Sequence, residues 1–165
     1  MHPEIPPQGR PRDEVLPPAY RARVEEGLNR LATQVGLNLK PHDRLINSRP
    51  ALQAAEFSRQ TGHFDAMHRA LFRAYWDEGR DISDRSVLHE LAQRLGMDAD
   101  AMDAAVAADR FGDDLDVRRA EAEDLMIDGI PAHVIADRYL VMGAQPYDVF
   151  ERVLARLDVP RRVPT

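Results

Sequence analysis

The stretch Gly129–Pro146, GIPAHVIADRYLVMGAQP, decides how the rest of the chain is interpreted. Its proline at position 131 stands directly before an apolar segment, where a central strand would need the backbone N–H that proline lacks. A cis Ile130–Pro131 bond in a tight turn is the usual reason for such a proline. We therefore expect a cis-proline loop that leads into a strand.

A hairpin and a closing helix are expected after this loop. Residues 132–135 and 139–142 carry apolar sequence with period two, and the polar connection at 136–138 is short enough for a β-hairpin. Pro146 then falls in the first turn of a helix, and apolar positions recur behind it at helical spacing. The C-terminal end is thus predicted to be loop, hairpin and helix.

From about residue 18 to residue 127, the sequence pattern predicts helices only. Residues 18–35 form an amphipathic pattern, and each later segment also repeats its apolar positions at helical spacing. The strongest stripe runs from Phe64 to Tyr75, and core packing explains it better than a cofactor site. Another short strand is expected at residues 2–5.

Composition excludes several classes of function. A length of 165 residues suits one domain, and a net charge of −6 with scattered arginines argues against a nucleic-acid partner. No apolar run approaches a membrane span, and the first residues do not form a basic and apolar leader, so we expect a soluble cytoplasmic protein. The absence of cysteine excludes disulfides and thiol chemistry carried by this chain alone.

The sequence also predicts neither a metal site nor a cofactor. His63 and His68 are five residues apart and therefore do not share a helix face as a metal-binding pair would. The acidic runs lack the glycine and closing glutamate of a calcium loop. A glycine-rich phosphate loop after a strand and a Gly-x-Ser-x-Gly elbow are both missing from the sequence.

With these features in place, the tail Gly129–Pro146 resembles the end of a DsbA-family thioredoxin-like domain, in which a Gly-Val/Ile-Pro-Thr/Ala segment carries the cis-proline. Upstream, residues 47–52 (NSRPAL), 63–76 (HFDAMHRALFRAYW) and 79–82 (GRDI) are similar to the inserted helical subdomain of the FrnE-like branch, often named predicted dithiol-disulfide isomerases. Residues 2–9 (HPEIPPQG) resemble the second strand of that branch and the loop after it.

The resemblance implies a mostly helical α/β fold, an incomplete thioredoxin-like domain over residues 1–165. A helical insertion would occupy about residues 42–127, and residues 128–158 would hold the cis-proline loop, the hairpin and the last helix. The family's first strand and first helix, which opens with Cys-x-x-Cys, have no counterpart after Met1. We therefore expect a truncated gene, a misplaced start or a shortened chain.

The function implied by the resemblance is thiol–disulfide exchange with polypeptide substrates, as an oxidoreductase or isomerase. In that family a low-pKa thiolate attacks the substrate disulfide, and the residue before the cis-proline, here Ile130, offers backbone hydrogen bonds to the substrate chain beside Pro131. Ile130 and Pro131 are thus the expected substrate-binding residues. Without a dithiol we expect this chain to be redox-inactive as it stands, so whether it is an enzyme stays open.

Two other functions remain open at this point. The family's isomerase relatives, the 2-hydroxychromene-2-carboxylate isomerases and kappa-class glutathione transferases, use a serine and glutathione. A non-catalytic binding module would use the groove around Ile130 and Pro131. Without the first strand, we expect either a disordered N-terminus or a homodimer that pairs through the edge at residues 132–135.

Overall fold

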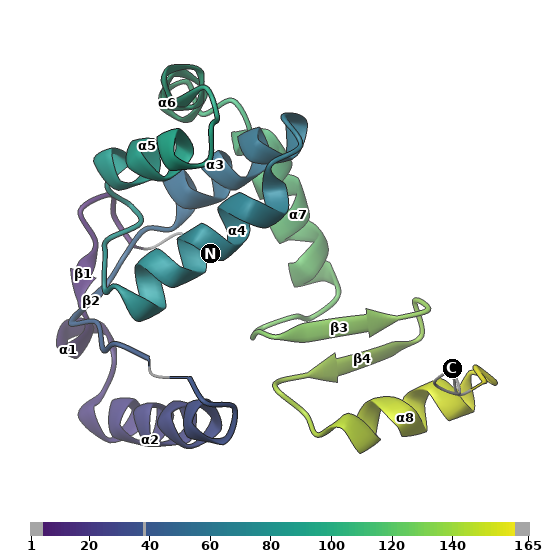
Figure 1. The fold of residues 1–165 in the computed structure, drawn as a ribbon. Helices are drawn as coiled ribbons and strands as arrows, with labels where there is room; N and C mark the ends of the chain where they lie inside the picture. Colours follow the sequence, from purple (N-terminus) through teal and green to yellow (C-terminus); the bar gives the residue numbers. More distant parts are fainter. Residues whose placement is uncertain (1–4, 38, 161–165) are drawn as a thin grey trace. The chain divides into compact units, whose positions relative to one another are not determined.

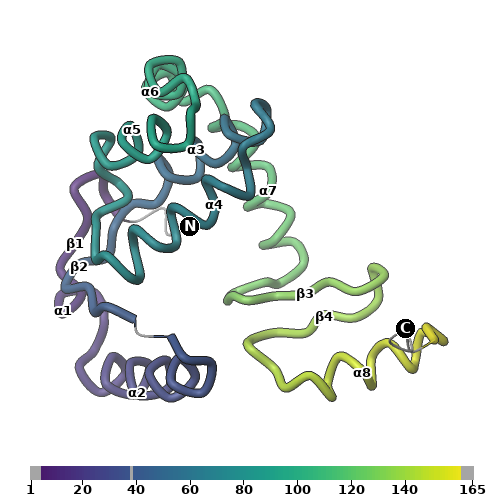
Figure 2. The backbone as a smooth tube through the Cα atoms, viewed as in Figure 1, coloured from purple at the N-terminus to yellow at the C-terminus, as the bar shows by residue number. Residues whose placement is uncertain are grey.

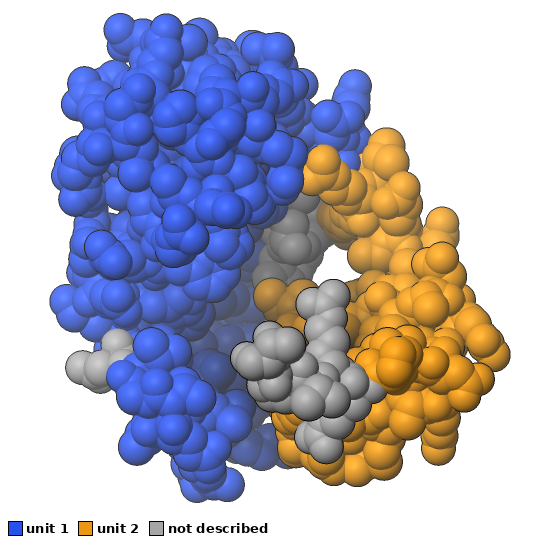
Figure 3. All heavy atoms as spheres, turned by 45° about the vertical axis from the view of Figure 1, so that its right-hand side comes forward, with its two compact units in different colours: residues 1–115 blue, residues 116–165 orange. Residues whose placement is uncertain are grey.

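The computed structural model describes residues 5–37 and 39–160 (Figures 1 and 2). Residues 2–4 of the expected first strand lie outside the described residues, and Ile5 is a buried residue in a bend instead of a strand. The chain forms two compact units, residues 1–115 and 116–165, coloured separately in Figure 3. The limits of about 42–127 for a helical insertion stay a prediction.

The first unit contains a small antiparallel sheet of two strands, each two residues long. Strand β1 (Arg10–Pro11) pairs antiparallel with β2 (Arg44–Leu45), and α1 (Arg12–Val15) and α2 (Pro18–Gln34) lie between them in the chain. The expectation of helices alone from residue 18 to residue 127 was therefore wrong at β2. A strand of two residues is too short to show a period of two, which is why the pattern did not indicate it.

Four α-helices and a π-helical turn build the core of the first unit; the four α-helices are labelled α3 to α6 in Figure 1. Their bounds are α3 (Arg49–Gln60), α4 (Phe64–Phe72), η1 (Arg73–Asp77), α5 (Arg85–Arg94) and α6 (Ala99–Ala107). Met67 and Leu71 of the stripe on α4 are buried in this core, as predicted, whereas Phe72 is exposed and packs against His68. The aromatic stripe is thus mainly a packing surface.

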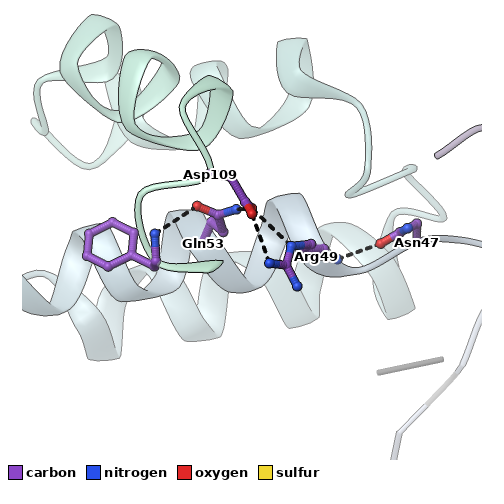
Figure 4. A network of polar contacts seen from close by, with 5 residues as sticks. Asn47, Arg49, Gln53 and Asp109 are labelled. Carbon is purple, nitrogen blue, oxygen red and sulfur yellow. Dashed lines mark hydrogen bonds and ion pairs between the residues drawn. The ribbon is translucent and has the colours of Figure 1, made fainter. Parts of the chain in front are cut away.

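A polar network ties α3 to the connection between α6 and α7 (Gly112–Asp124) (Figure 4). Arg49 donates to both carboxylate oxygens of Asp109, and the Gln53 side-chain amide donates to the same group. The side-chain oxygen Oε1 of Gln53 accepts a hydrogen bond from the backbone N–H of Phe111 at 3.3 Å. Asp109 has a positive φ of 50°, so this network holds an unusual backbone turn in place.

The second unit contains the predicted hairpin and the predicted last helix. Strands β3 (Ala132–Ile135) and β4 (Tyr139–Met142) pair antiparallel, and α8 (Tyr147–Arg156) follows Pro146. In the turn, Ala136 and Asp137 both have φ of 52°, and the N–H of Arg138 donates to the Ile135 carbonyl at 3.2 Å. Positive φ at both central residues defines a type I′ turn, whose twist matches that of the strands it joins.

The hairpin and α8 share a small interior. Val141 on β4 and Val153 on α8 are buried, and the rings of His133 and Phe150 meet edge to face with centroids 5.0 Å apart. Leu154 was expected to point inward from α8 but is partly exposed. The spacing of apolar residues therefore identified the helix correctly but overestimated the width of its buried face.

Candidate functional site

The Ile130–Pro131 peptide bond is cis, as predicted from the sequence. The Pro131 carbonyl accepts the N–H of Gly143 at 2.8 Å, which ties the loop to the residue that follows β4. Ile130 is 91% exposed, and Pro131 is exposed as well. The loop is thus anchored through one carbonyl while its apolar side chains face solvent.

The hydrogen bond to Gly143 also determines which backbone groups of β3 are free. In an antiparallel pair, residues alternate between those whose N–H and C=O face the partner strand and those whose groups face away. Since the Pro131 carbonyl faces β4, the backbone groups of Ala132 and Val134 face the opposite edge. Among residues 5–37 and 39–160, β3 pairs with β4 alone, so these groups form an open edge.

An apolar cavity of about 170 Å³ lies on the hairpin beside this edge. Val134 and Leu140 stand opposite each other in the register and are 43% and 41% exposed. Leu125, which follows α7, completes the apolar lining, and the turn closes one end with Asp137, Arg138 and Tyr139. The period of two placed Val134 and Leu140 on one face, but no sequence pattern indicated that Leu125 would meet them.

These features support binding but contain no thiol nucleophile. The free N–H and C=O groups of the edge can pair with an extended chain, and the cavity can take an apolar side chain. The whole sequence contains no cysteine, so this chain has no thiolate to offer. Within the described part of the chain, no cluster of three or more histidine or acidic residues is arranged to hold a metal ion.

The sequence matches the family model of the DSBA-like thioredoxin domain over residues 1–155. The chain belongs to the DSBA-like thioredoxin domain family. The predictions of the DsbA family and of a mostly helical, thioredoxin-like α/β fold are thereby confirmed. Placement of this DSBA-like domain in the FrnE-like branch stays a prediction.

The fold is also seen in a solved structure. The crystal structure of the probable DsbA oxidoreductase SCO1869 from Streptomyces coelicolor is 27% identical to this chain, with a TM-score of 0.71. The match covers 87% of this chain and 62% of that one. This DSBA-like domain thus spans less than two thirds of the length of the solved protein.

A second relative is the uncharacterized protein YwbO of Bacillus subtilis (strain 168). It is 23% identical over 149 residues, which cover 87% of this chain and 72% of YwbO. No helix among the described residues is both long enough and apolar enough to cross a membrane. The cytoplasmic location stays a prediction.

Proposed function

We propose that this DSBA-like domain binds polypeptide thiol or disulfide substrates in an extended conformation beside Ile130 and Pro131. The observation that carries the proposal is the open edge of β3 directly after the anchored cis-proline loop. A polypeptide that runs along this edge would pair with the backbone groups of Ala132 and Val134 and place an apolar side chain against Leu140. Membership of the DSBA-like family and the similarity to a probable DsbA oxidoreductase support thiol–disulfide exchange as the chemistry of the substrates.

The chemistry of this lineage needs a thiolate, and this polypeptide contains no cysteine. We therefore propose that the chain as it stands binds a substrate without exchanging its disulfides. An insulin-reduction assay with dithiothreitol tests this part of the proposal, because a catalyst accelerates the precipitation of the insulin B chain. The rate with the chain is expected to equal the rate without it, and an acceleration would contradict the proposal.

Binding can be tested with reduced and carboxymethylated α-lactalbumin, which stays unfolded and carries no free thiol. Val134→Pro removes an N–H on the outer edge without removing a bond of the ladder with β4. The variant loses the hydrogen bond from the Val134 N–H to the bound chain, and its ring obstructs the edge. Both effects together are expected to weaken binding about tenfold. Val134→Ala keeps the N–H, so it is the matched control and should lose less affinity.

Far-UV circular dichroism and cross-strand nuclear Overhauser effects between His133 and Val141, which are paired in the register, verify that the hairpin persists in both variants. If both variants bind the unfolded probe as the parent chain does, the edge of β3 is not the binding surface. That result would overturn the proposal.

The same open edge supports a second proposal, a homodimer in which β3 of one copy pairs with β3 of another. An unpaired edge is a template for a second chain, and Val134→Pro would obstruct this pairing too. Sedimentation equilibrium over a range of concentrations should show a dimer that Val134→Pro weakens and Val134→Ala largely preserves. A single monomeric species at every concentration would contradict the dimer and leave polypeptide binding to be judged by its own test.

Two other functions remain as alternatives. A protein like the 2-hydroxychromene-2-carboxylate isomerases or kappa-class glutathione transferases would bind glutathione, whereas the proposal expects no heat of binding in a calorimetric titration with it. A non-catalytic binding module would bind the unfolded probe but belong to a gene without a dithiol segment. Translation of the genomic DNA upstream of the Met1 codon distinguishes that module from a redox enzyme, because only the enzyme requires Cys-x-x-Cys in frame.

A further inference from the structure

Two adjoining cavities in the first unit lie between α2 and the segment that follows it in the chain. The smaller, about 150 Å³, has an apolar wall formed by Leu28, Leu39, Pro41 and Trp76. The larger, about 370 Å³, is lined mainly by charged side chains. Arg12, Glu25 and His42 line both cavities, so they stand where the apolar and polar spaces meet.

Arg12 presents a buried donor at this junction. Its Nη1 donates to the His42 carbonyl at 3.2 Å and reaches Glu25 at 3.5 Å. Its Nε is buried and has no hydrogen-bond partner among the described residues. Buried donors of charged groups are normally paired, because leaving one unpaired is costly. A small shift of the Arg12 side chain toward an acceptor in the cavities would therefore be favourable.

The walls around Arg12 are held in place by contacts of their own. The His42 ring stacks on Tyr75 with centroids 3.7 Å apart, and its Nε2 lies 2.8 Å from the Tyr75 carbonyl. The N–H of Lys40 donates to the Trp76 carbonyl at 2.8 Å. A cavity with fixed walls loses little entropy when a ligand enters it.

The charges that line the two cavities cancel. Three are cationic and three are carboxylates, namely Arg12, Arg21 and Lys40 against Asp13, Glu25 and Asp43. A simple anion would meet the carboxylates, and a simple cation would meet the guanidinium groups. A zwitterion satisfies both sets, since its negative group can accept from Arg12 while its positive group faces the acids.

We propose that these cavities bind a free amino acid with an apolar side chain. Its carboxylate accepts from the Arg12 guanidinium, its ammonium group faces the acidic side chains, and its side chain enters the apolar cavity beside Trp76. An apolar cavity of about 150 Å³ holds a group roughly the size of benzene, which is close to the isobutyl group of leucine. The inference is independent of the function proposed for the β3 edge.

Trp76 is the single tryptophan of the chain and lines the apolar cavity, so its fluorescence reports occupancy directly. L-leucine is the probe, and isothermal titration calorimetry supplies a second readout. Three matched compounds each lack one recognised group: glycine lacks the side chain, 4-methylpentanoate lacks the ammonium group, and 3-methylbutylamine lacks the carboxylate. Leucine should bind saturably, and each of the three should bind at least about tenfold more weakly.

Two pairs of variants test the residues. Arg12→Lys keeps the charge but removes the buried Nε, and it should weaken leucine binding about tenfold. Leu28→Gln puts a polar group into the apolar wall, whereas Leu31→Gln changes the same helix at a position that does not line either cavity. Both leucines are partly exposed, so these two variants should fold, and the first alone should lose binding.

Three results would overturn the proposal: no saturable binding of leucine by either readout, binding of 4-methylpentanoate as tight as that of leucine, or equal effects of Leu28→Gln and Leu31→Gln. Arg12→Lys also removes the hydrogen bond to the His42 carbonyl. If this variant does not fold for that reason, the comparison of Leu28→Gln with Leu31→Gln still decides the outcome.

Discussion

Arg49 and Asp109 form a bidentate ion pair across 60 positions of sequence, with Nε and Nη2 each 2.9 Å from a carboxylate oxygen. Parallel hydrogen bonds of this kind fix orientation as well as distance. Gln53, 2% exposed, extends the pair into the interior through its bond to the Phe111 N–H. The start of α3 is thereby locked to the turn that leads into α7.

The side chains of Arg49 and Asp109 occupy the space that a side chain at Gly112 would need. A Cβ at this position would lie 2.2 Å from Asp109 Oδ2 and 2.5 Å from Arg49 Nη2. Gly112→Ala should therefore lower the free energy of unfolding by about 1–3 kcal/mol, as overpacking does. Urea denaturation measures the change.

Gly27→Ala is the matched control for Gly112→Ala, because its Cβ would meet nothing within 4 Å. It should raise stability by up to about 1 kcal/mol, since alanine is the better helix former in α2. Equal stability of the two variants would show that the Arg49 and Asp109 pair can shift to make room.

The ion pair should also contribute to stability in acid. The hydrogen bond from Arg49 holds the pKa of the Asp109 carboxyl below its ordinary value of 3.8. A group whose pKa is lower in the folded protein adds stability that is present above its unfolded pKa and is lost as pH falls through the folded one. Below about pH 4 the parent chain should therefore lose stability more steeply than Asp109→Asn.

A double-mutant cycle isolates this contribution to the pH dependence. In an Arg49→Met background, the pKa of Asp109 is no longer lowered by the guanidinium. Asp109→Asn should then hardly change how the free energy of unfolding falls with pH below about pH 4. Urea denaturation between pH 3 and pH 6 provides the measurement. The same change in slope with and without Arg49 would assign the effect to another carboxylate.

The hairpin turn offers a stabilising substitution. Ala136 has a positive φ of 52°, a region that costs L-residues about 1–2 kcal/mol but costs glycine nothing. Ala136→Gly should raise the free energy of unfolding by up to about 1 kcal/mol after the greater freedom of glycine in the unfolded chain is subtracted. Ala144→Gly is the control, because Ala144 does not have a positive φ, and it should not raise the free energy of unfolding. An equal increase at both positions would show that relief of the positive φ is not the cause.

The apolar face of the hairpin should determine how well an unfolded polypeptide binds. Leu140→Ser removes part of the cavity beside the β3 edge. It should weaken binding of carboxymethylated α-lactalbumin severalfold, because a half-exposed leucine that a ligand covers contributes about 1 kcal/mol of apolar burial. Leu154→Ser on α8 removes a similarly exposed leucine outside this cavity and should leave binding unchanged. If both variants bind equally weakly, general surface hydrophobicity drives the binding.

The second unit was the part best predicted from the sequence. Both strands of the hairpin and the cis bond at Pro131 match the expectation, because local chemistry decides them: a proline before a strand, a period of two and a short polar turn. The pair between Arg49 and Asp109 could not be predicted, because no local pattern relates residues so far apart. Contacts of that kind depend on how helices pack.

The helix α2 shows a different limit of the sequence pattern. Its apolar spacing predicted the helix correctly, yet Leu31 and Val35 are 48% and 70% exposed. Periodicity identifies which residues share a face, but it does not say what covers that face. For the same reason the cavity at Leu28 could not be foreseen, since much of its lining comes from residues after α2.

The position of the chain's one tryptophan has a consequence for folding experiments. Trp76 belongs to the unit of residues 1–115, whereas far-UV circular dichroism records helices of both units. Tryptophan fluorescence therefore follows the melting of one unit, and the circular dichroism signal follows the melting of the whole chain. Coincident curves would mean that the two units unfold as one cooperative block, and separated curves would give each unit its own stability.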